Sequence, residues 1–261
     1  MKTLPTKPAS ANPGAAFPDE AVQANHSALV ARNASNLRFG YDVEASVRFV
    51  VEQALPLRGH VLDIGTGKGR FVIPLARHVA RVTTVDINAE EQRVAQMEAL
   101  YAGVAARLDF VLADARALPW RAGSFDAVTS WNVFHHLDDP ESVFNEMLRV
   151  LKPGGKLVLA DFSPSGFRIM DAMHEAEGKQ HPHPPSRFPH WRAELQNNGF
   201  AVRRFVKHHQ EVLIAKHSVN QKVRRGARLT DASVHGVTRP IRLPGSRKLN
   251  LRDISHQTKV N

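Results

Sequence analysis

The 261-residue sequence contains no cysteine, which excludes disulfide bonds and thiolate metal sites. This composition fits a reducing compartment, and we predict a cytoplasmic location. No apolar run approaches the roughly 20 residues that a membrane-spanning helix needs. The first residues, MKTLPTKPASANPGAAF, lack the continuous apolar stretch of a secretory signal. We therefore expect neither a membrane span nor a signal peptide.

Acidic residues are scarce near the C-terminus, and this scarcity produces most of the formal net charge of +10. Residues 218–261 contain ten Lys/Arg against two Asp/Glu, whereas the preceding 217 residues contain 25 against 23. The tail also lacks periodicity and contains few large apolar side chains, so we predict that it is disordered. Its charge is consistent with non-specific binding of nucleic acid. A solubilising extension is an equally good interpretation, because the tail has no aromatic side chains for base stacking.

Regular periodicity is also absent from residues 1–25, which are rich in Pro, Ala and Asn and are predicted to be disordered. The remaining stretch, residues 26–217, is long enough for one α/β domain with a full core. Its first part, residues 27–55, has helical spacing of apolar positions. The segment 38–42 within it has two interpretations, a lid over a ligand and a loop that only packs.

The most informative stretch is HVLDIGTGKGRF at residues 60–71, which predicts a buried strand, a glycine-rich turn and the start of a helix. Glycine allows the backbone to approach a ligand closely, and helix N-termini attract anionic groups. The dinucleotide pattern G-x-G-x-x-G fails because Arg70 stands at the third glycine position. The phosphate-loop pattern fails because Gly69 follows Lys68. Asp63, two positions before the first glycine, would repel a pyrophosphate and attract an ammonium group.

The following sequence alternates between strand and helix patterns, which indicates a parallel sheet covered on both faces. Further strands are predicted at 81–86, 108–112, 125–131 and 156–162, with helices at 89–100 and 140–151.

Residues 163–190 break this alternation with prolines and histidines. A helix is predicted at about 189–198, followed by strands at 200–208 and 211–217 whose short junction permits only a hairpin. We predict an α/β fold of three layers, built on a Rossmann-like, mostly parallel seven-stranded sheet with an antiparallel C-terminal hairpin strand. Dinucleotide dehydrogenases of the Rossmann type do not end in this way.

Five segments together resemble the class I S-adenosylmethionine-dependent methyltransferases: DIGTGKG (63–69), VDIN (85–88), ADARALPW (113–120), FDAVTSWNVFHHLDDP (125–140) and RVLKPGGKLVLADF (149–162). The last two are similar to the methyltransferases of ubiquinone and menaquinone biosynthesis. The resemblance covers residues 38–162 by motif and residues 188–217 by topology only. It implies S-adenosylmethionine as cofactor.

The resemblance assigns roles in holding that cofactor to eight residues, in addition to Asn132. Gly65, Thr66 and Gly67 would lie against its methionine part, and Asp63 would hold its ammonium group directly or through water. Asp86, at the end of a strand, would accept both ribose hydroxyls, although a helix N-cap before Ala89 is the alternative interpretation. Ile87 would form an apolar wall for the adenine, and Asp114 and Ala115 would contact the adenine edge, with a simple loop turn as the alternative.

Residues after the fourth strand lie where open α/β sheets place ligands. Asn132 is predicted to face the methionine end, whereas Trp131 is predicted to be a core residue. The resemblance implies that one of His135 and His136 caps the next segment while the other packs; a catalytic base is the alternative. Lys68 and Arg70 are either solvated helix residues or ligands of the cofactor carboxylate.

Residues 163–190 are predicted to be an insertion that selects the methyl acceptor. Phe167, Ile169, Met170 and Met173 suggest an apolar wall, and His174, His181, His183 and His190 supply polar side chains. The histidines lack tight ligand spacing, so we predict no metal site. A titratable pocket lining and a solvated loop are the other interpretations, and His181 joins His135 and His136 as a candidate base. No residue is required to be catalytic, because proximity alone accounts for much of methyl transfer.

The sequence therefore predicts methyl transfer from S-adenosylmethionine to an O, N or C atom of a small molecule, by in-line displacement. The alternatives are an RNA or protein methyltransferase that uses the basic tail, a non-catalytic module that binds the cofactor, and a nicotinamide dehydrogenase. The acceptor and the oligomeric state cannot be predicted.

Overall fold

The computed structural model describes residues 17–179 and 187–217. The chain divides into two units, Met1–Gln221 and Lys222–Asn261, and every described residue belongs to the first. The tail predicted to be disordered, 218–261, lies outside the described residues.

The main elements are, in chain order, α1 (Asp19–Arg38), α2 (Val43–Ala54), β1 (His60–Ile64), α3 (Val72–Ala76), β2 (Arg81–Asp86), α4 (Ala89–Tyr101), β3 (Leu108–Leu112), β4 (Phe125–Trp131), α5 (Pro140–Val150), β5 (Leu151–Phe162), α6 (Pro164–Ala176), α7 (Phe188–Asn197), β6 (Phe200–Lys207) and β7 (Gln210–His217). Short 3₁₀ turns cover Ala105–Arg107 and Phe134–His136.

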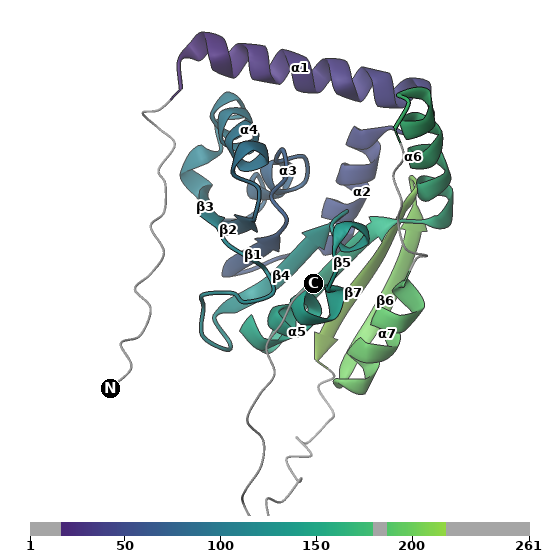
Figure 1. The fold of residues 1–261 in the computed structure, drawn as a ribbon. Coiled ribbons are helices and arrows are strands. Elements are labelled where there is room, and N and C mark those ends of the chain that lie inside the picture. The colour runs from purple at the N-terminus through teal and green to yellow at the C-terminus, as the bar shows by residue number, and fades with distance from the viewer. Residues whose placement is uncertain (1–16, 180–186, 218–261) are drawn as a thin grey trace, which may run out of the picture. The chain divides into compact units, whose positions relative to one another are not determined.

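Seven strands form one sheet in the order β3-β2-β1-β4-β5-β7-β6 (Figure 1). β1 to β5 pair in parallel, and β7 pairs antiparallel with both β5 and β6. The chain therefore moves outward from β1 to β3 and then crosses to β4 on the other side of β1. Open α/β sheets bind ligands at such a reversal, beside the carboxyl ends of the strands. The predicted fold class is confirmed, including the antiparallel C-terminal hairpin.

The two faces of the sheet are covered by different helices, as alternation along each strand requires. Val61 and its neighbours on one face pack with residues of α2, α3 and α4. Leu62, on the opposite face of the same strand, belongs to a second cluster with residues of α5 and α7. This arrangement gives the predicted three layers, and it leaves the carboxyl ends of the strands to build a site.

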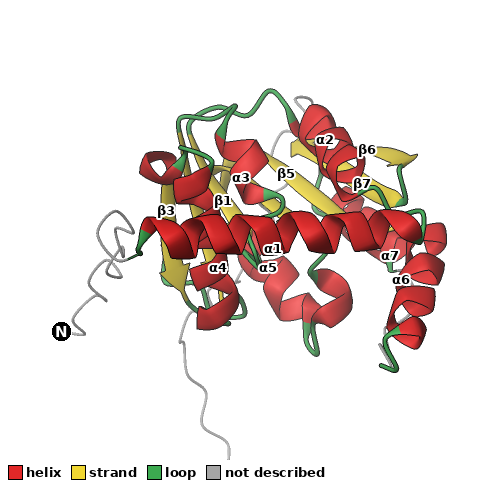
Figure 2. Cartoon of the chain, turned by 90° about the horizontal axis from the view of Figure 1, so that it is seen from above, coloured by secondary structure: helices red, strands yellow, loops and turns green. Residues whose placement is uncertain are grey.

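Helix α1 is longer than the sequence predicted. It begins at Asp19, so the prediction of disorder over residues 1–25 is wrong for its last part; residues 1–16 lie outside the described residues. Among its residues only Asn36 is fully buried. Such a polar helix gives no periodic signal, and its contacts with α4 and α6 stabilise it instead. His26 stacks on Tyr101 of α4 with ring centroids 3.6 Å apart, and Arg32 pairs with Glu177 just after α6. Figures 1 and 2 show α1 running from α4 to α6.

Residues 163–190 also contain more regular structure than predicted. Ser163 caps α6, because its hydroxyl accepts a hydrogen bond from the Gly166 N–H, and Phe167 and Met173 bury one side of the helix. Residues 180–186 lie outside the described residues. Farther along the chain, α7 and the β6–β7 hairpin lie within two residues of their predicted bounds. None of the helices in the described ranges combines the length and apolarity needed to cross a bilayer.

Candidate functional site

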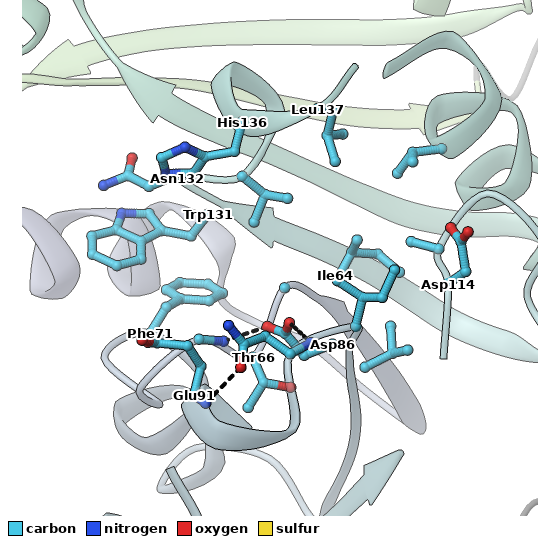
Figure 3. Close-up of a pocket in the computed structure, with 18 of the residues that line it drawn as sticks. Ile64, Thr66, Phe71, Asp86, Glu91, Asp114, Trp131, Asn132, His136 and Leu137 are labelled. Carbon is cyan, nitrogen blue, oxygen red and sulfur yellow. Dashed lines mark hydrogen bonds between the residues drawn. The ribbon is translucent and has the colours of Figure 1, made fainter. Parts of the chain in front are cut away.

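A cavity of about 850 Å³ lies at the carboxyl ends of the central strands (Figure 3). The segments that follow β1, β2, β3 and β4 all contribute to its lining, and α6 adds Met170 and His174. This position is the reversal point of the sheet, where the topology predicts a ligand.

The cavity brings together most of the residues predicted to form a site. Those that line it are Gly65, Thr66, Gly67, Asp86, Ile87, Asp114, Ala115, Asn132 and His136. Asp63 and His135 are not among the described residues that line it, and His181 lies outside the described residues. Figure 3 shows Asp114 on one side of the cavity and Trp131, Asn132 and His136 on the other.

Asp86 ends β2 at the bottom of the cavity. One carboxylate oxygen accepts the Gly67 N–H at 2.7 Å, and the other accepts the Asn88 N–H at 2.8 Å. The N-cap of α4 is Asn88, whose side chain accepts from Glu90 and Glu91. The N-cap interpretation of Asp86 is therefore wrong. Each oxygen keeps a second lone pair, so the carboxylate can still accept hydrogen bonds from a ligand.

Buried polar side chains support the glycine turn from below. Thr66 Oγ1 lies 2.8 Å from Thr84 Oγ1 and accepts from Gln92 Nε2, which also donates to the Val111 carbonyl. The Gly65 and Thr66 N–H groups both donate to the Val85 carbonyl. These bonds join the turn to β2, β3 and α4, so the turn is fixed before a ligand arrives.

Asp63 belongs to this buried network instead of the cavity wall. Its carboxyl group accepts hydrogen bonds from Thr84 at 3.0 Å and from Thr129 at 2.9 Å, and the residue is 2% exposed. Burial raises its pKa from 3.8 to about 7; the two threonine hydroxyls oppose this shift and the charge of Asp86 adds to it. The structure thus places Asp63 beneath the turn, where contact with a ligand in the cavity would be indirect.

The raised pKa predicts a pH-dependent effect of Asp63→Asn. A carboxyl group that binds its proton more tightly in the folded state stabilises that state at low pH, and the stabilisation is lost as pH rises from about 4 to about 7. Asparagine does not titrate. We expect the free energy of unfolding of the variant, relative to wild type, to rise by about 2 kcal/mol between pH 5 and pH 8 in urea titrations.

Asp126→Asn is the matched control for this measurement. The pKa of Asp126 is lowered by its hydrogen bond with Lys152, so the effect of its replacement is expected to be the same at pH 5 and pH 8. If the difference in the free energy of unfolding between Asp63→Asn and wild type were also independent of pH, the raised pKa of Asp63 would be contradicted.

Two cations line the cavity beside the glycine turn, and they differ in their partners. Lys68 Nζ lies 3.6 Å from Glu91 Oε1. Arg70 forms no ion pair within the described ranges; with the Asn36 amide oriented to accept, its Nη1 donates to Asn36 Oδ1 at 3.2 Å. Burial lowers the pKa of its guanidinium. A half-buried guanidinium without a carboxylate partner is suited to an anionic ligand group.

The end of β4 forms the opposite wall. Trp131, predicted as a core residue, lines the cavity and stacks on Phe71 with ring centroids 6.2 Å apart. Trp131 Nε1 and Asn132 Oδ1 are buried and have no hydrogen-bond partner in the part of the chain that the structure describes. Buried polar atoms are normally paired, so this donor and this acceptor mark a place that a ligand can complete.

The two adjacent histidines have different surroundings. His135 is buried, its Nδ1 lies 2.6 Å from Asp161 Oδ1, and its backbone N–H donates to the other oxygen of that carboxylate. His136 lines the cavity. Asp139 is the N-cap of α5, so the expectation that one of the two histidines caps this segment is wrong. Of the two candidate bases in the described ranges, only His136 contacts the cavity.

The far end of the cavity contains one exposed apolar side chain. Ile87 is 70% exposed and offers an apolar surface that a flat ligand can cover. Asp114 pairs with Arg116 at 2.6 Å, and this hydrogen bond lowers the pKa of its carboxyl group.

Helix α6 contributes to the wall of the cavity. Its residues Met170 and His174 line the wall, and His174 Nδ1 lies 2.8 Å from the Met170 carbonyl oxygen. Two of the side chains that were predicted to face an acceptor thus reach the cavity. Within the described ranges, no group of three or more His, Asp or Glu residues is arranged to hold a metal ion.

Sequence reasoning missed the contribution of Tyr41, and it predicted only one of the two roles of Trp131, which packs against the core and also lines the cavity. Tyr41 is only 2% exposed, but it belongs to no periodic pattern of apolar residues. It lies within the segment interpreted as a lid or a loop. Its phenol oxygen accepts from Asn132 Nδ2 at 3.4 Å. Nothing in local spacing connects residues 91 positions apart.

Part of the chain is similar to known methyltransferases. Residues 62–159 match the family model described as "Methyltransferase domain". The chain is 34% identical over 126 residues to a ubiquinone biosynthesis O-methyltransferase of Xanthomonas axonopodis, covering 47% of this chain and 52% of that protein. It is 35% identical over 133 residues to a ubiquinone/menaquinone biosynthesis C-methyltransferase of Pseudomonas putida, covering 49% and 52%. The chain thus spans about half the length of the curated relatives it matches.

A solved structure is similar to a larger part of the chain. The YcgJ protein from Bacillus subtilis aligns with a TM-score of 0.51 and 26% identity, covering 62% of this chain and 70% of that one.

Proposed function

We propose that this chain, which carries a class I S-adenosylmethionine-dependent methyltransferase domain, transfers a methyl group from S-adenosylmethionine to a small-molecule acceptor. The observation that carries the proposal is the cavity at the reversal of the sheet, where a strand-end carboxylate, an open glycine turn and a guanidinium that forms no ion pair with any described residue converge.

The residues present fit this cofactor. A Cβ placed on Gly67 would meet no atom within 4 Å, so the turn leaves open space where a ligand can approach the backbone. Asp86 supplies acceptors for a ribose diol, exposed Ile87 supplies an apolar surface for adenine, and Arg70 supplies a cation for a carboxylate. Trp131 and Asn132, each with one buried polar atom that has no partner among the described residues, lie at the end of β4, which is next to β1, the strand that leads into the turn containing Arg70.

The strand order gives these contacts a direction. Asp114 follows β3, Asp86 follows β2, Gly65 follows β1 and Asn132 follows β4, and these strands are neighbours in this order. We propose that the adenine lies beside β3, the ribose beside β2 and the amino-acid part beside β1 and β4. Asp63, buried beneath the glycine turn, then affects the amino-acid part only indirectly, by supporting the turn.

The cofactor supplies a methyl group on a positively charged sulfur. When the methyl group is transferred, the neutral thioether S-adenosylhomocysteine is a good leaving group. The chain has to hold an acceptor atom in line with that methyl group and to exclude water, and orientation of this kind contributes up to about 7–11 kcal/mol. Trp131, Met170, His136 and His174 surround the part of the cavity that we assign to the acceptor. His136 is placed to take a proton if the acceptor must lose one. A cytoplasmic location stays a prediction.

The test is formation of S-adenosylhomocysteine when purified protein is incubated with S-adenosylmethionine and a panel of phenols, quinols and amines. Product that depends on one acceptor class supports the proposal. Binding of the cofactor without product across the panel would favour a non-catalytic binding module. Product only with polynucleotides or proteins, lost at high salt, would favour the alternative that uses the basic tail.

Arg70→Gln tests the assignment of the carboxylate. Loss of the guanidinium removes a charge-assisted hydrogen bond worth about 1.5–3 kcal/mol, so calorimetry should show S-adenosylhomocysteine binding at least about tenfold more weakly. A decarboxylated analogue should bind wild type and variant equally. Arg77→Gln, an exposed position at the end of α3, is the control. Equal losses for both ligands would assign Arg70 to structure instead of carboxylate binding.

A further inference from the structure

Asn132 has an unusual backbone for a residue that lines the cavity. Its φ of 53° lies in the left-handed region, which residues other than glycine rarely adopt. Its N–H donates to the Ala160 carbonyl of β5 at 2.9 Å, which fixes the backbone in this conformation. Strained residues of this kind persist where the surroundings hold them, and they cluster at ligand sites. The direction in which the Asn132 side chain points is therefore set by its partners.

The partner of the Asn132 side chain is Tyr41, which lies just before α2. Its phenol oxygen accepts from Asn132 Nδ2 at 3.4 Å and from Gln210 Nε2 at 3.2 Å. Its ring packs edge-on against Phe162, with centroids 5.4 Å apart. Burial raises the pKa of Tyr41 to about 12, so the group is a neutral hydroxyl at physiological pH. One buried oxygen thus joins two amides from distant parts of the chain.

Both amides present their NH₂ groups to the Tyr41 oxygen. Because each uses its NH₂ group toward Tyr41, the Asn132 and Gln210 carbonyl oxygens are turned away, and neither has a partner in the part of the chain that the structure describes. For Asn132, which lines the cavity, this leaves an acceptor beside the end of β4. A ligand N–H group can satisfy it, whereas an amide in the reverse orientation would offer a donor.

Gln210 provides a rigid anchor for this arrangement. It is fully buried at the start of β7. The turn before it is held from two sides, because Ser46 Oγ donates to the His208 carbonyl at 2.7 Å and the Ser163 N–H donates to the His209 carbonyl at 2.9 Å. The turn is thus held by contacts other than Tyr41, and Tyr41 links the hairpin to the cavity residue Asn132.

We propose that Tyr41 is a positioning residue whose hydroxyl orients the Asn132 side chain toward the amino-acid end of the bound cofactor and couples it to Gln210 of the C-terminal hairpin. This inference rests on the proposed function, since it uses the assignment of the amino-acid end to β1 and β4. It extends the site beyond residues 62–159, into the N-terminal segment and the last hairpin.

Tyr41→Phe keeps the ring and its contact with Phe162 and removes only the hydroxyl. Calorimetry with two ligands separates orientation from general damage. S-adenosylhomocysteine has the amino-acid end, whereas 5′-methylthioadenosine has the same nucleoside and sulfur without it. We expect the variant to bind S-adenosylhomocysteine about tenfold more weakly, a difference of about 1.4 kcal/mol, and to bind methylthioadenosine as wild type does.

The chain offers a matched control, because Tyr101 is its only other tyrosine. Tyr101→Phe removes a hydroxyl outside the cavity lining and is expected to change neither affinity. Gln210→Met keeps the size of the side chain and removes the hydrogen bond to Tyr41. It is expected to weaken binding of S-adenosylhomocysteine but not of methylthioadenosine, by less than Tyr41→Phe does. If Tyr41→Phe does not fold at 25 °C, the Gln210→Met variant tests the positioning role in its place.

Equal losses for both ligands, or no loss for either, would overturn the positioning role. Failure of wild type to bind S-adenosylhomocysteine would instead overturn the proposed function.

Discussion

Replacing Asp86 with alanine is expected to weaken binding of S-adenosylhomocysteine at least about 100-fold. The carboxylate ends β2 in the cavity and, in our proposal, accepts both ribose hydroxyls. Hydrogen bonds to a charged group are worth about 1.5–3 kcal/mol each, and each 1.4 kcal/mol is a factor of ten in affinity. Titration calorimetry on the purified variant measures this loss directly.

Asp86 also holds the glycine turn through the N–H of Gly67, so the loss of affinity has to be separated from a loss of stability. Thermal unfolding of the same sample measures the second effect, which we expect to be a few degrees. Asp109→Ala is the control: Asp109 pairs with Arg81 between β2 and β3, away from the cavity lining, and its loss should leave affinity unchanged. Unchanged affinity in Asp86→Ala would remove the ribose assignment.

Alanine at two glycines of the same turn is expected to have different main effects, a loss of stability at Gly65 and a loss of cofactor affinity at Gly67. A Cβ at Gly65 would lie 2.2 Å from Val133 Cγ2, whereas a Cβ at Gly67 would meet nothing within 4 Å. Both residues have positive φ, 85° and 47°, so each substitution carries the cost of a left-handed backbone, about 1–2 kcal/mol. Only Gly65→Ala adds a clash with packed atoms, worth about a further 1–3 kcal/mol.

We therefore expect Gly65→Ala to lower the free energy of unfolding by about 2–5 kcal/mol. Gly67→Ala should cost about 1–2 kcal/mol of stability and yet weaken cofactor binding about tenfold to 100-fold, because the new methyl group projects into the ligand space. Urea unfolding and calorimetry on both variants provide the comparison. Full affinity in Gly67→Ala would show that the ligand does not pass over this part of the turn.

The sequence predicted the parts of the fold that depend on local patterns. Short apolar runs such as that before Gly65 are unambiguous as strands when glycines and amphipathic helices alternate with them. The short junction at His209 predicted a hairpin, and with it the antiparallel β7. These signals require only neighbouring residues, and the strand order of the sheet agrees with them.

The features that the sequence did not predict depend on contacts between distant segments. Helix α1 has polar residues on all sides and is held by α4 and α6, so its first turns resemble a disordered segment. Asp63 belongs to a motif, but its burial depends on Thr84 and Thr129 from two neighbouring strands. Tyr41 contributes a single hydroxyl between residues 132 and 210. Local periodicity contains no information about such pairs.

Whether the cavity binds this cofactor is decided by calorimetric titration of the purified wild-type chain with S-adenosylmethionine and S-adenosylhomocysteine. We expect saturable binding of both ligands with one site per chain. No heat with either ligand, or binding of a nicotinamide dinucleotide in their place, would contradict it.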